Sequence, residues 1–136
     1  MIYLAYFAAP ILVAVGLMLA LATDPGVRWR LRARRPAEQR GIALLRSWLT
    51  PEQAEQWETR GDFEVVGCDT GRRYRITPGT AMNIRELDGD GHAIAQWCFV
   101  PEGKLVTGDI LLAQKIALET MEQRVLALAY TQPPRP

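Results

Sequence analysis

Two short stretches and two cysteines in this 136-residue sequence carry the side-chain types that enzymes and metal sites use. The triplet "DTG", residues 69–71, presents a carboxylate beside a hydroxyl, and "DGDGH", residues 88–92, places two carboxylates close to the single histidine. Cys68 and Cys98 are the candidate nucleophiles. Carboxylates suit acid–base or metal chemistry, and a thiol beside a histidine suits nucleophilic catalysis. Each stretch has to be weighed against an ordinary structural role.

The triplet at residues 69–71 resembles the loop on which aspartic proteases carry their catalytic aspartate. That family has a small residue after the glycine and a later apolar strand ending in glycine, whereas Arg72 follows here and the candidate strand stops before Pro101. Arg72 and Arg73 would also keep nearby carboxylates ionised, although the protease mechanism needs two aspartates that share one proton. Asp and Gly are residues that tight turns favour, so the triplet is predicted to be a turn between two strands.

The stretch "DGDGH" does not complete a calcium loop. Counted from Asp88, the fifth position is His92 and the twelfth is Phe99, where an EF-hand loop has an oxygen ligand and a glutamate. A Cys–His pair would need Cys68 or Cys98 beside this histidine, yet both cysteines lie in or next to predicted strands, where thiols are usually packing groups. We therefore predict a glycine-rich hairpin turn here, and no catalytic, cofactor-binding or metal-binding residues in the chain.

The first 23 residues, "MIYLAYFAAPILVAVGLMLALAT", contain no ionisable side chain. At about 1.5 Å of helical rise per residue, a run of this length matches the hydrocarbon core of a bilayer. No Lys or Arg precedes the run, whereas a secretory signal peptide has a basic segment there. We therefore expect residues 1–23 to form a transmembrane helix, with a cleaved signal peptide or a buried core helix as the alternatives.

A basic segment follows the apolar run, and residues 24–36 are predicted to be a juxtamembrane linker. Residues 28–40 hold six arginines against one glutamate. Because a positive cluster after a span stays in the cytoplasm, we predict a single-pass protein of the inner (plasma) membrane, with its N-terminus outside and its C-terminal domain in the cytoplasm. Lipid head groups are the expected contacts of the following side chains, with nucleic-acid phosphates as the alternative: Arg28, Trp29, Arg30, Arg32, Arg34 and Arg35.

Residues 37–131 show the periodicities of a small α+β domain. Helical spacing over residues 37–49 and the capping-box sequence "TPEQ" at 50–53 indicate two short helices, the second ending at Gly61. The period then changes to two, which predicts a four-stranded antiparallel meander with strands in residues 62–68, 72–77, 80–86 and 93–100.

A long helix is expected from Thr107 or Asp109 to Tyr130, packed on the sheet and capped by its own "TGD" sequence. Its inner stripe would consist of Leu111, Leu118, Met121, Val125 and Leu128. The proline-rich residues 132–136 are expected to be a flexible tail.

Four arginines on the predicted sheet form its candidate docking face: Arg72, Arg73, Arg75 and Arg85. Glu64 and Glu86 on neighbouring strands can neutralise them, so a self-paired surface is the alternative. Residues 41–136 hold ten basic and thirteen acidic side chains, a balance that disfavours nucleic acid as the partner.

The sequence therefore favours a membrane-anchored interaction module, a non-enzymatic accessory or stabilising subunit of a larger membrane protein complex. Its expected partners are the lipid bilayer and another membrane protein. Two alternatives stay open. One is a membrane-tethered domain that binds a small ligand, phosphate or nucleic acid through the four arginines, and the other is an enzyme of unrecognised pattern, acid-based around Asp69 and Glu64.

Overall fold

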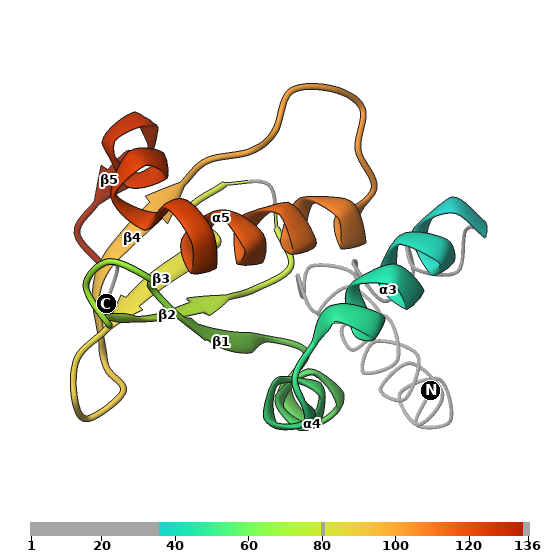
Figure 1. The fold of residues 1–136 in the computed structure, drawn as a ribbon, viewed down its shortest axis with the longest axis horizontal. Helices are drawn as coiled ribbons and strands as arrows, with labels where there is room; N and C mark the ends of the chain where they lie inside the picture. Colours follow the sequence, from blue (N-terminus) through green and yellow to red (C-terminus); the bar gives the residue numbers. More distant parts are fainter. Residues whose placement is uncertain (1–35, 80, 135–136) are drawn as a thin grey trace, which may run out of the picture. The chain divides into compact units, whose positions relative to one another are not determined.

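The computed structural model of the chain describes residues 36–79 and 81–134, all of which belong to one compact unit. These residues form three helices and one five-stranded antiparallel sheet, in which the strands lie side by side in sequence order. In chain order the elements are α3 (Pro36–Trp48), α4 (Pro51–Arg60), β1 (Phe63–Val66), β2 (Arg73–Ile76), β3 (Ile84–Leu87), β4 (Ala93–Cys98), α5 (Thr107–Leu128) and β5 (Tyr130–Gln132) (Figure 1). The α+β class is confirmed, and the meander has one strand more than predicted.

The predicted transmembrane helix (residues 1–23) lies outside the described residues. So does the basic linker, apart from Pro36, which begins α3. Within residues 36–79 and 81–134, no helix has both the length and the hydropathy that crossing a bilayer requires. The membrane span and the lipid-contacting arginines therefore stay predictions.

The second helix, α4, has the capping box that its sequence predicts. The Thr50 hydroxyl accepts a hydrogen bond from the Gln53 N–H (3.2 Å), and the Gln53 side chain accepts one from the Thr50 N–H (3.1 Å). Gly61 ends the helix in the left-handed conformation at φ 76°, which glycine adopts without steric cost.

Two glutamines of α4 also close the outer edge of β1. The Gln53 amide donates to the Glu64 carbonyl oxygen (2.8 Å), and the Glu64 N–H donates to the Gln56 side-chain oxygen (2.7 Å). Unpaired backbone groups on an edge strand invite pairing with another chain. The side chains of α4 remove that possibility at the centre of β1.

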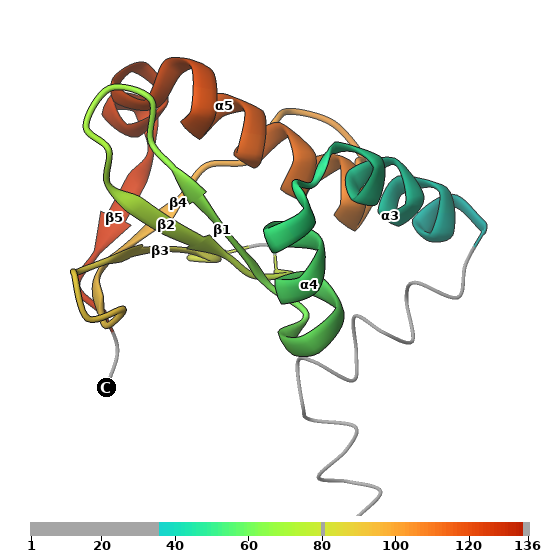
Figure 2. The ribbon, with the colours of Figure 1, turned by 60° about the horizontal axis from the view of Figure 1, so that its bottom comes forward.

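The sheet presents one face to α5, which crosses it (Figure 2). Cross-strand register and alternation place two rows of side chains on this face: Phe63, Ile76, Ile84 and Trp97 in one, and Val65, Tyr74, Glu86 and Ala95 in the other. Most of these side chains are fully buried, together with Leu111 and Leu118 of α5. The core therefore lies between the sheet and the first four turns of α5.

The predicted inner stripe of the long helix is correct only for its first half. Leu111 and Leu118 are buried, but Met121 and Leu128 are exposed. The reason is a kink: Met121 has φ −152° and ψ 43°, which interrupts the helix and turns its last segment. Beyond the kink Glu122, rather than an apolar side chain, is fully buried.

Both ends of α5 differ from the sequence-based expectation. Val106 is the N-cap and has no capping side chain, and the Thr107 N–H donates instead to the Glu38 carboxylate of α3 (3.0 Å). At the other end Tyr130–Gln132 pair with β4 as β5, so the predicted tail is wrong at residue 132. A three-residue strand is too short for its periodicity to be recognised in the sequence.

Helices α3 and α5 approach each other closely because glycines meet at their crossing. A Cβ atom added at Gly108 would overlap the backbone of Gly41 and Ile42, and one added at Gly41 would overlap the Val106 side chain. Gly41 and Gly108 are both buried. The crossing thus depends on the absence of side chains at these two positions.

We predict that Gly108→Ala destabilises the protein by about 2 kcal/mol, because overpacking against backbone outweighs the better helix propensity of alanine. Urea denaturation of the full chain in mild detergent, followed by circular dichroism, measures the change. Gly89→Ala is the matched control, since a Cβ atom there meets nothing within 4 Å. Equal stability of the two variants would show that the helices can separate without cost.

Candidate functional site

The triplet at residues 69–71 lies in the connection between β1 and β2, as predicted, and forms a tight turn. The Gly71 N–H donates to the Gly67 carbonyl oxygen (3.0 Å), and the Gly67 N–H donates to the Arg72 carbonyl oxygen (2.8 Å). Gly71 has φ 70°, a conformation that favours glycine.

This turn encloses the carboxylate of Glu122, which comes from the last part of α5 and is fully buried. The N–H groups of Asp69 and Thr70 each donate to Glu122 Oε2 at 2.8 Å. The Thr70 hydroxyl and the Tyr74 hydroxyl donate to Oε1, the latter at 2.7 Å. Four donors match the acceptor capacity of a carboxylate, so the buried charge is fully compensated.

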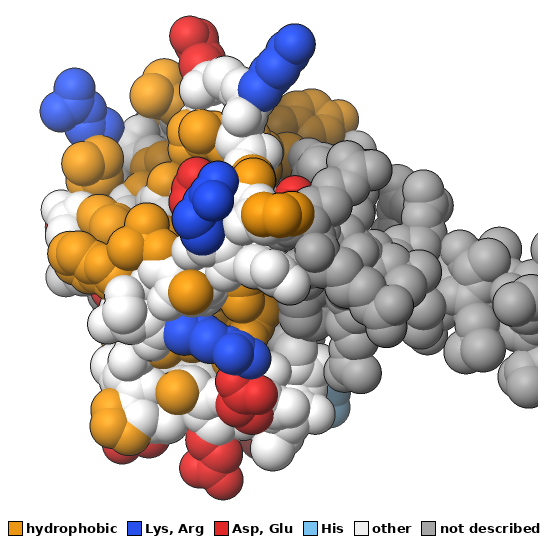
Figure 3. Space-filling view, turned by 90° about the vertical axis from the view of Figure 1, so that its right-hand side faces the viewer, with side chains coloured by type: hydrophobic (Ala, Val, Ile, Leu, Met, Phe, Trp, Pro, Cys, Tyr) orange, Lys and Arg blue, Asp and Glu red, His pale blue; other side chains and the backbone are white. Residues whose placement is uncertain are grey.

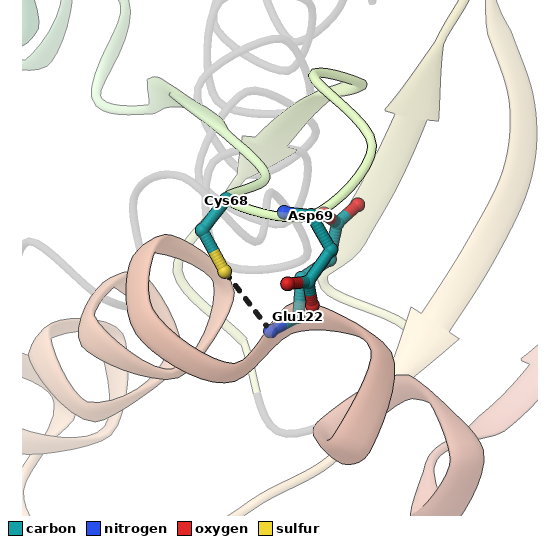
Figure 4. Close-up of side chains that lie close together, drawn as sticks. All are labelled: Cys68, Asp69 and Glu122. Atoms are coloured by element: carbon teal, nitrogen blue, oxygen red, sulfur yellow. Dashed lines mark hydrogen bonds between the residues drawn. The ribbon is translucent and has the colours of Figure 1, made fainter.

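The turn in return binds the backbone that the kink exposes. Asp69 Oδ2 accepts a hydrogen bond from the Gln123 N–H (2.9 Å), and Cys68 Sγ accepts one from the Glu122 N–H (3.5 Å) (Figure 4). A helix start leaves N–H groups without partners inside the helix, and side-chain acceptors commonly cap them. We call this set of residues the Glu122 latch: Cys68, Asp69, Thr70, Tyr74 and Glu122.

The electrostatics of the latch keep Glu122 ionised and Tyr74 neutral. Burial on its own would raise the pKa of Glu122, but hydrogen bonds from Thr70, Tyr74 and the N–H groups of the turn outweigh it and lower the pKa. Burial raises the pKa of Tyr74, and its bond to the Glu122 carboxylate raises it further. At neutral pH Tyr74 is therefore a neutral donor to an ionised carboxylate.

Ligand atoms of Cys68, Asp69 and Glu122 lie within 4.8 Å of one another, a grouping that a metal ion could use. Their hydrogen bonds explain why these three side chains lie close together without a metal ion. Glu122 accepts from four donors, and Asp69 and Cys68 accept from N–H groups of α5 at the kink. The contacts thus describe a structural latch.

The second stretch, "DGDGH", forms the predicted hairpin turn between β3 and β4. Asp88 Oδ1 accepts hydrogen bonds from the N–H groups of Asp90 (2.9 Å) and His92 (2.8 Å), and these bonds lower the pKa of Asp88. Gly91 has φ 85°. Side chains of Asp88, Asp90 and His92 gather within 4.8 Å, but the backbone bonds of the turn suffice to explain the arrangement.

The two cysteines are free thiols in different surroundings. Cys98 is half-buried in β4, in keeping with a packing role, whereas Cys68 is exposed at the latch. The prediction of a packed thiol is therefore wrong for Cys68, because the turn after β1 carries it out of the sheet.

The four arginines of the predicted docking face do not share one environment. Arg72 pairs with Glu86 (2.9 Å), a buried residue on the face toward α5 that also accepts a bond from the Trp97 indole (3.1 Å). The other three lie on the face opposite α5, which we call the basic face: Arg73, Arg75 and Arg85.

One carboxylate serves two arginines of the basic face. Glu64 pairs with Arg73 and Arg75, both at 2.8 Å. Burial acts to raise the pKa of Glu64, but the two guanidinium groups lower it overall. Arg85 is exposed and has no ion pair among the described residues. The expectation of a self-paired surface is thus met for three of the four arginines, Arg72 included, and not for Arg85.

A groove of about 410 Å³ lies beside the basic face, between α4, β1 and α5. Its charged lining consists of Glu52, Glu64, Glu119 and Arg73. Glu64 and Glu119 are held by basic side chains, the latter by Lys115. The third carboxylate of the lining, Glu52, has no salt bridge among residues 36–79 and 81–134.

Sequence reasoning missed the polar residues that α5 buries. The Glu122 carboxylate accepts hydrogen bonds from the turn at residues 67–72. The Gln114 amide exchanges two hydrogen bonds with the Asn83 amide (2.8 and 3.1 Å) and also donates to the Phe99 carbonyl oxygen (2.8 Å). A signal was present, because residues 114 and 122 fall on the same helical stripe as Leu111 and Leu118. A polar side chain at a core position of a helix indicates a buried partner.

Comparison of the chain with protein-family models, with curated proteins and with solved structures finds no match. The roles of the latch and of the basic face therefore have to be argued from their own contacts and charges.

We predict that Glu122→Gln lowers the free energy of unfolding at pH 7 by about 2 kcal/mol, because an amide cannot accept four hydrogen bonds and brings its own donors to the turn. The folded-state pKa of Glu122 is lowered, so its contribution is present above the unfolded value of about 4.3 and is lost as the pH falls through the folded value. Urea titrations should therefore show that the difference in free energy of unfolding between the variant and the wild-type chain becomes smaller from pH 7 to pH 3.

Glu55→Gln is the control for this prediction, since Glu55 is exposed on α4. It should change the free energy of unfolding by less than about 0.5 kcal/mol at either pH. A gap between the Glu122 variant and the wild-type chain that is absent at pH 7, or unchanged at pH 3, would contradict the role given to the latch.

Proposed function

We propose that this chain is a membrane-anchored interaction module, an accessory subunit whose folded domain docks an acidic segment of a membrane protein through the basic face. The anchor is the uncharged run at residues 1–23, followed by six arginines in residues 28–40. The observation that carries the docking proposal is Arg85, an exposed cation with no ion pair among the described residues.

The charge balance of the basic face supports an anionic partner. Arg85 lies directly opposite Arg75 in the sheet register, and like charges in that position repel each other. Glu64 is already shared between Arg73 and Arg75, so it leaves a net positive face. A carboxylate from a partner would relieve the repulsion, and a guanidinium group can bind it through two parallel hydrogen bonds.

An acidic protein segment fits this face better than nucleic acid does. Among the described residues this face is small: Arg73, Arg75 and Arg85 lie on it, Arg60 reaches its edge, and Glu64 lies among them. Residues 41–136 as a whole carry thirteen acidic against ten basic side chains, which repels a polyanion. A short acidic segment needs only the local positive charge.

The test is Arg85→Glu in the full chain, tagged after Pro136 and purified in gentle detergent. We expect a stoichiometric membrane protein to co-purify with the wild-type chain and its recovery to fall at least about tenfold with the variant, which corresponds to roughly 1.4 kcal/mol of binding free energy. Native sizing and mass spectrometry measure both outcomes. Arg85 suits the test because its replacement leaves no carboxylate without a partner. Loss of Arg73 and Arg75 would leave Glu64 only its longer ion pair with Arg60 (3.7 Å).

The matched control is Arg124→Glu, which reverses an exposed charge on α5 and so away from the basic face. It should leave the recovery of the partner unchanged. A wild-type chain that purifies alone would overturn the accessory-subunit proposal, and equal loss with both variants would show that overall charge, not this face, governs binding.

A further inference from the structure

Helix α3 carries exposed apolar side chains next to the face that it buries. Gly41, Ile42 and Leu45 pack toward α5, whereas Leu44 is 47% and Trp48 57% exposed. These two residues share one stripe of the helix with Ala37 and Arg40, at steps of three, four and four. Figure 3 looks onto the side of the molecule where α3 lies, and hydrophobic side chains are visible there beside basic ones.

The stripe continues into a shallow hollow toward the start of α5. The hollow measures about 260 Å³ and is lined by Ala37, Arg40, Gly41, Leu44, Val106 and Asp109. Arg40 has no ion pair among residues 36–79 and 81–134, while Arg46 of the same helix pairs with Glu58 (2.8 Å). Among the nearby acids, Glu38 is engaged in capping α5 and Asp109 lines the hollow.

We infer that α3 lies on the cytoplasmic surface of the bilayer, with Leu44 and Trp48 in the head-group region and Arg40 beside them. This inference rests on the proposed membrane anchor. The thirteen residues from Asp24 to Pro36 can extend over at most about 45 Å, so α3 stays within that distance of the membrane surface whenever residues 1–23 span it.

The chemistry of the stripe fits the head-group region of a membrane. Tryptophan favours that region because its indole has an apolar body and a polar N–H group. A leucine one turn away adds apolar contact, and an arginine can reach lipid phosphates with its guanidinium group. Asp109 lines the same hollow as Arg40, so the hollow carries one charge of each sign. Apolar contact rather than attraction to anionic lipid is therefore the main contribution.

A lipid surface also fits the small size of this patch better than a protein partner does. Stable protein interfaces bury about 800 Å² on each side, far more than two exposed side chains supply. An anchored domain needs much less, since the tether keeps α3 at high local concentration near the bilayer.

The experiment compares the full chain with Trp48→Phe after reconstitution into vesicles of phosphatidylcholine and phosphatidylglycerol. The difference in tryptophan emission between the two chains reports Trp48, because the other three tryptophans are common to both. Vesicles with bromine on the acyl-chain carbons nearest the head groups should quench this difference emission at least about threefold relative to unbrominated vesicles. The reason is that bromine quenches an indole by contact, and an interfacial tryptophan lies beside those carbons. No change of the difference emission would overturn the inference.

A second pair of variants separates membrane contact from general effects on the fold. Leu44→Asp should reduce the quenching of Trp48 by at least half, whereas Ile94→Asp, at an exposed apolar position of β4, should leave it unchanged. Equal effects of the two variants would count against the contact.

Flotation of the wild-type chain with the vesicles tests the anchor separately. Failure to float would overturn anchor and inference together, whereas flotation without quenching of Trp48 would overturn the position of α3 alone.

Discussion

The burial of one carboxylate shapes the second half of this domain. Glu122 can be ionised inside the protein only because four donors surround it. Three of these donors belong to the turn at residues 67–72, and the fourth is the Tyr74 hydroxyl of β2. The kink at Met121 leaves the N–H groups of Glu122 and Gln123 free to donate hydrogen bonds to Cys68 and Asp69. Beyond the kink the chain is directed back to the sheet, where β5 pairs with β4.

The opposite end of α5 is fixed by different means. The glycine crossing brings α3 so close that Glu38 reaches the first N–H of α5. Helix α5 is therefore held by a charge-assisted bond at each end and by the apolar core in between. The basic face lies on the side of the sheet away from this helix, while the apolar stripe lies on α3, so the two proposed contacts would use separate surfaces.

Much of the fold follows from local rules. The sequence predicted the capping box of α4, the change of hydrophobic period after Gly61, and the turns at residues 69–71 and 88–92. It also predicted that Tyr74 and Ile76 are buried while the arginines that alternate with them face outward. These features depend on neighbours within a few positions, which is why sequence spacing suffices for them. The candidate docking face was only partly readable, since Arg72 turned out to serve Glu86.

The sequence by itself determined the α+β class, the meander and the turn at Asp69, because periodicity and turn chemistry are local properties. Tertiary structure alone decided which polar groups meet: Glu122 with a turn some fifty positions earlier, Gln114 with Asn83, and Glu38 with Thr107. It also decided that Arg85 would stay unpaired among the described residues while Arg73 and Arg75 share Glu64. A buried polar group is stabilised by whichever donor the packing brings within about 3 Å, and sequence separation does not encode that distance.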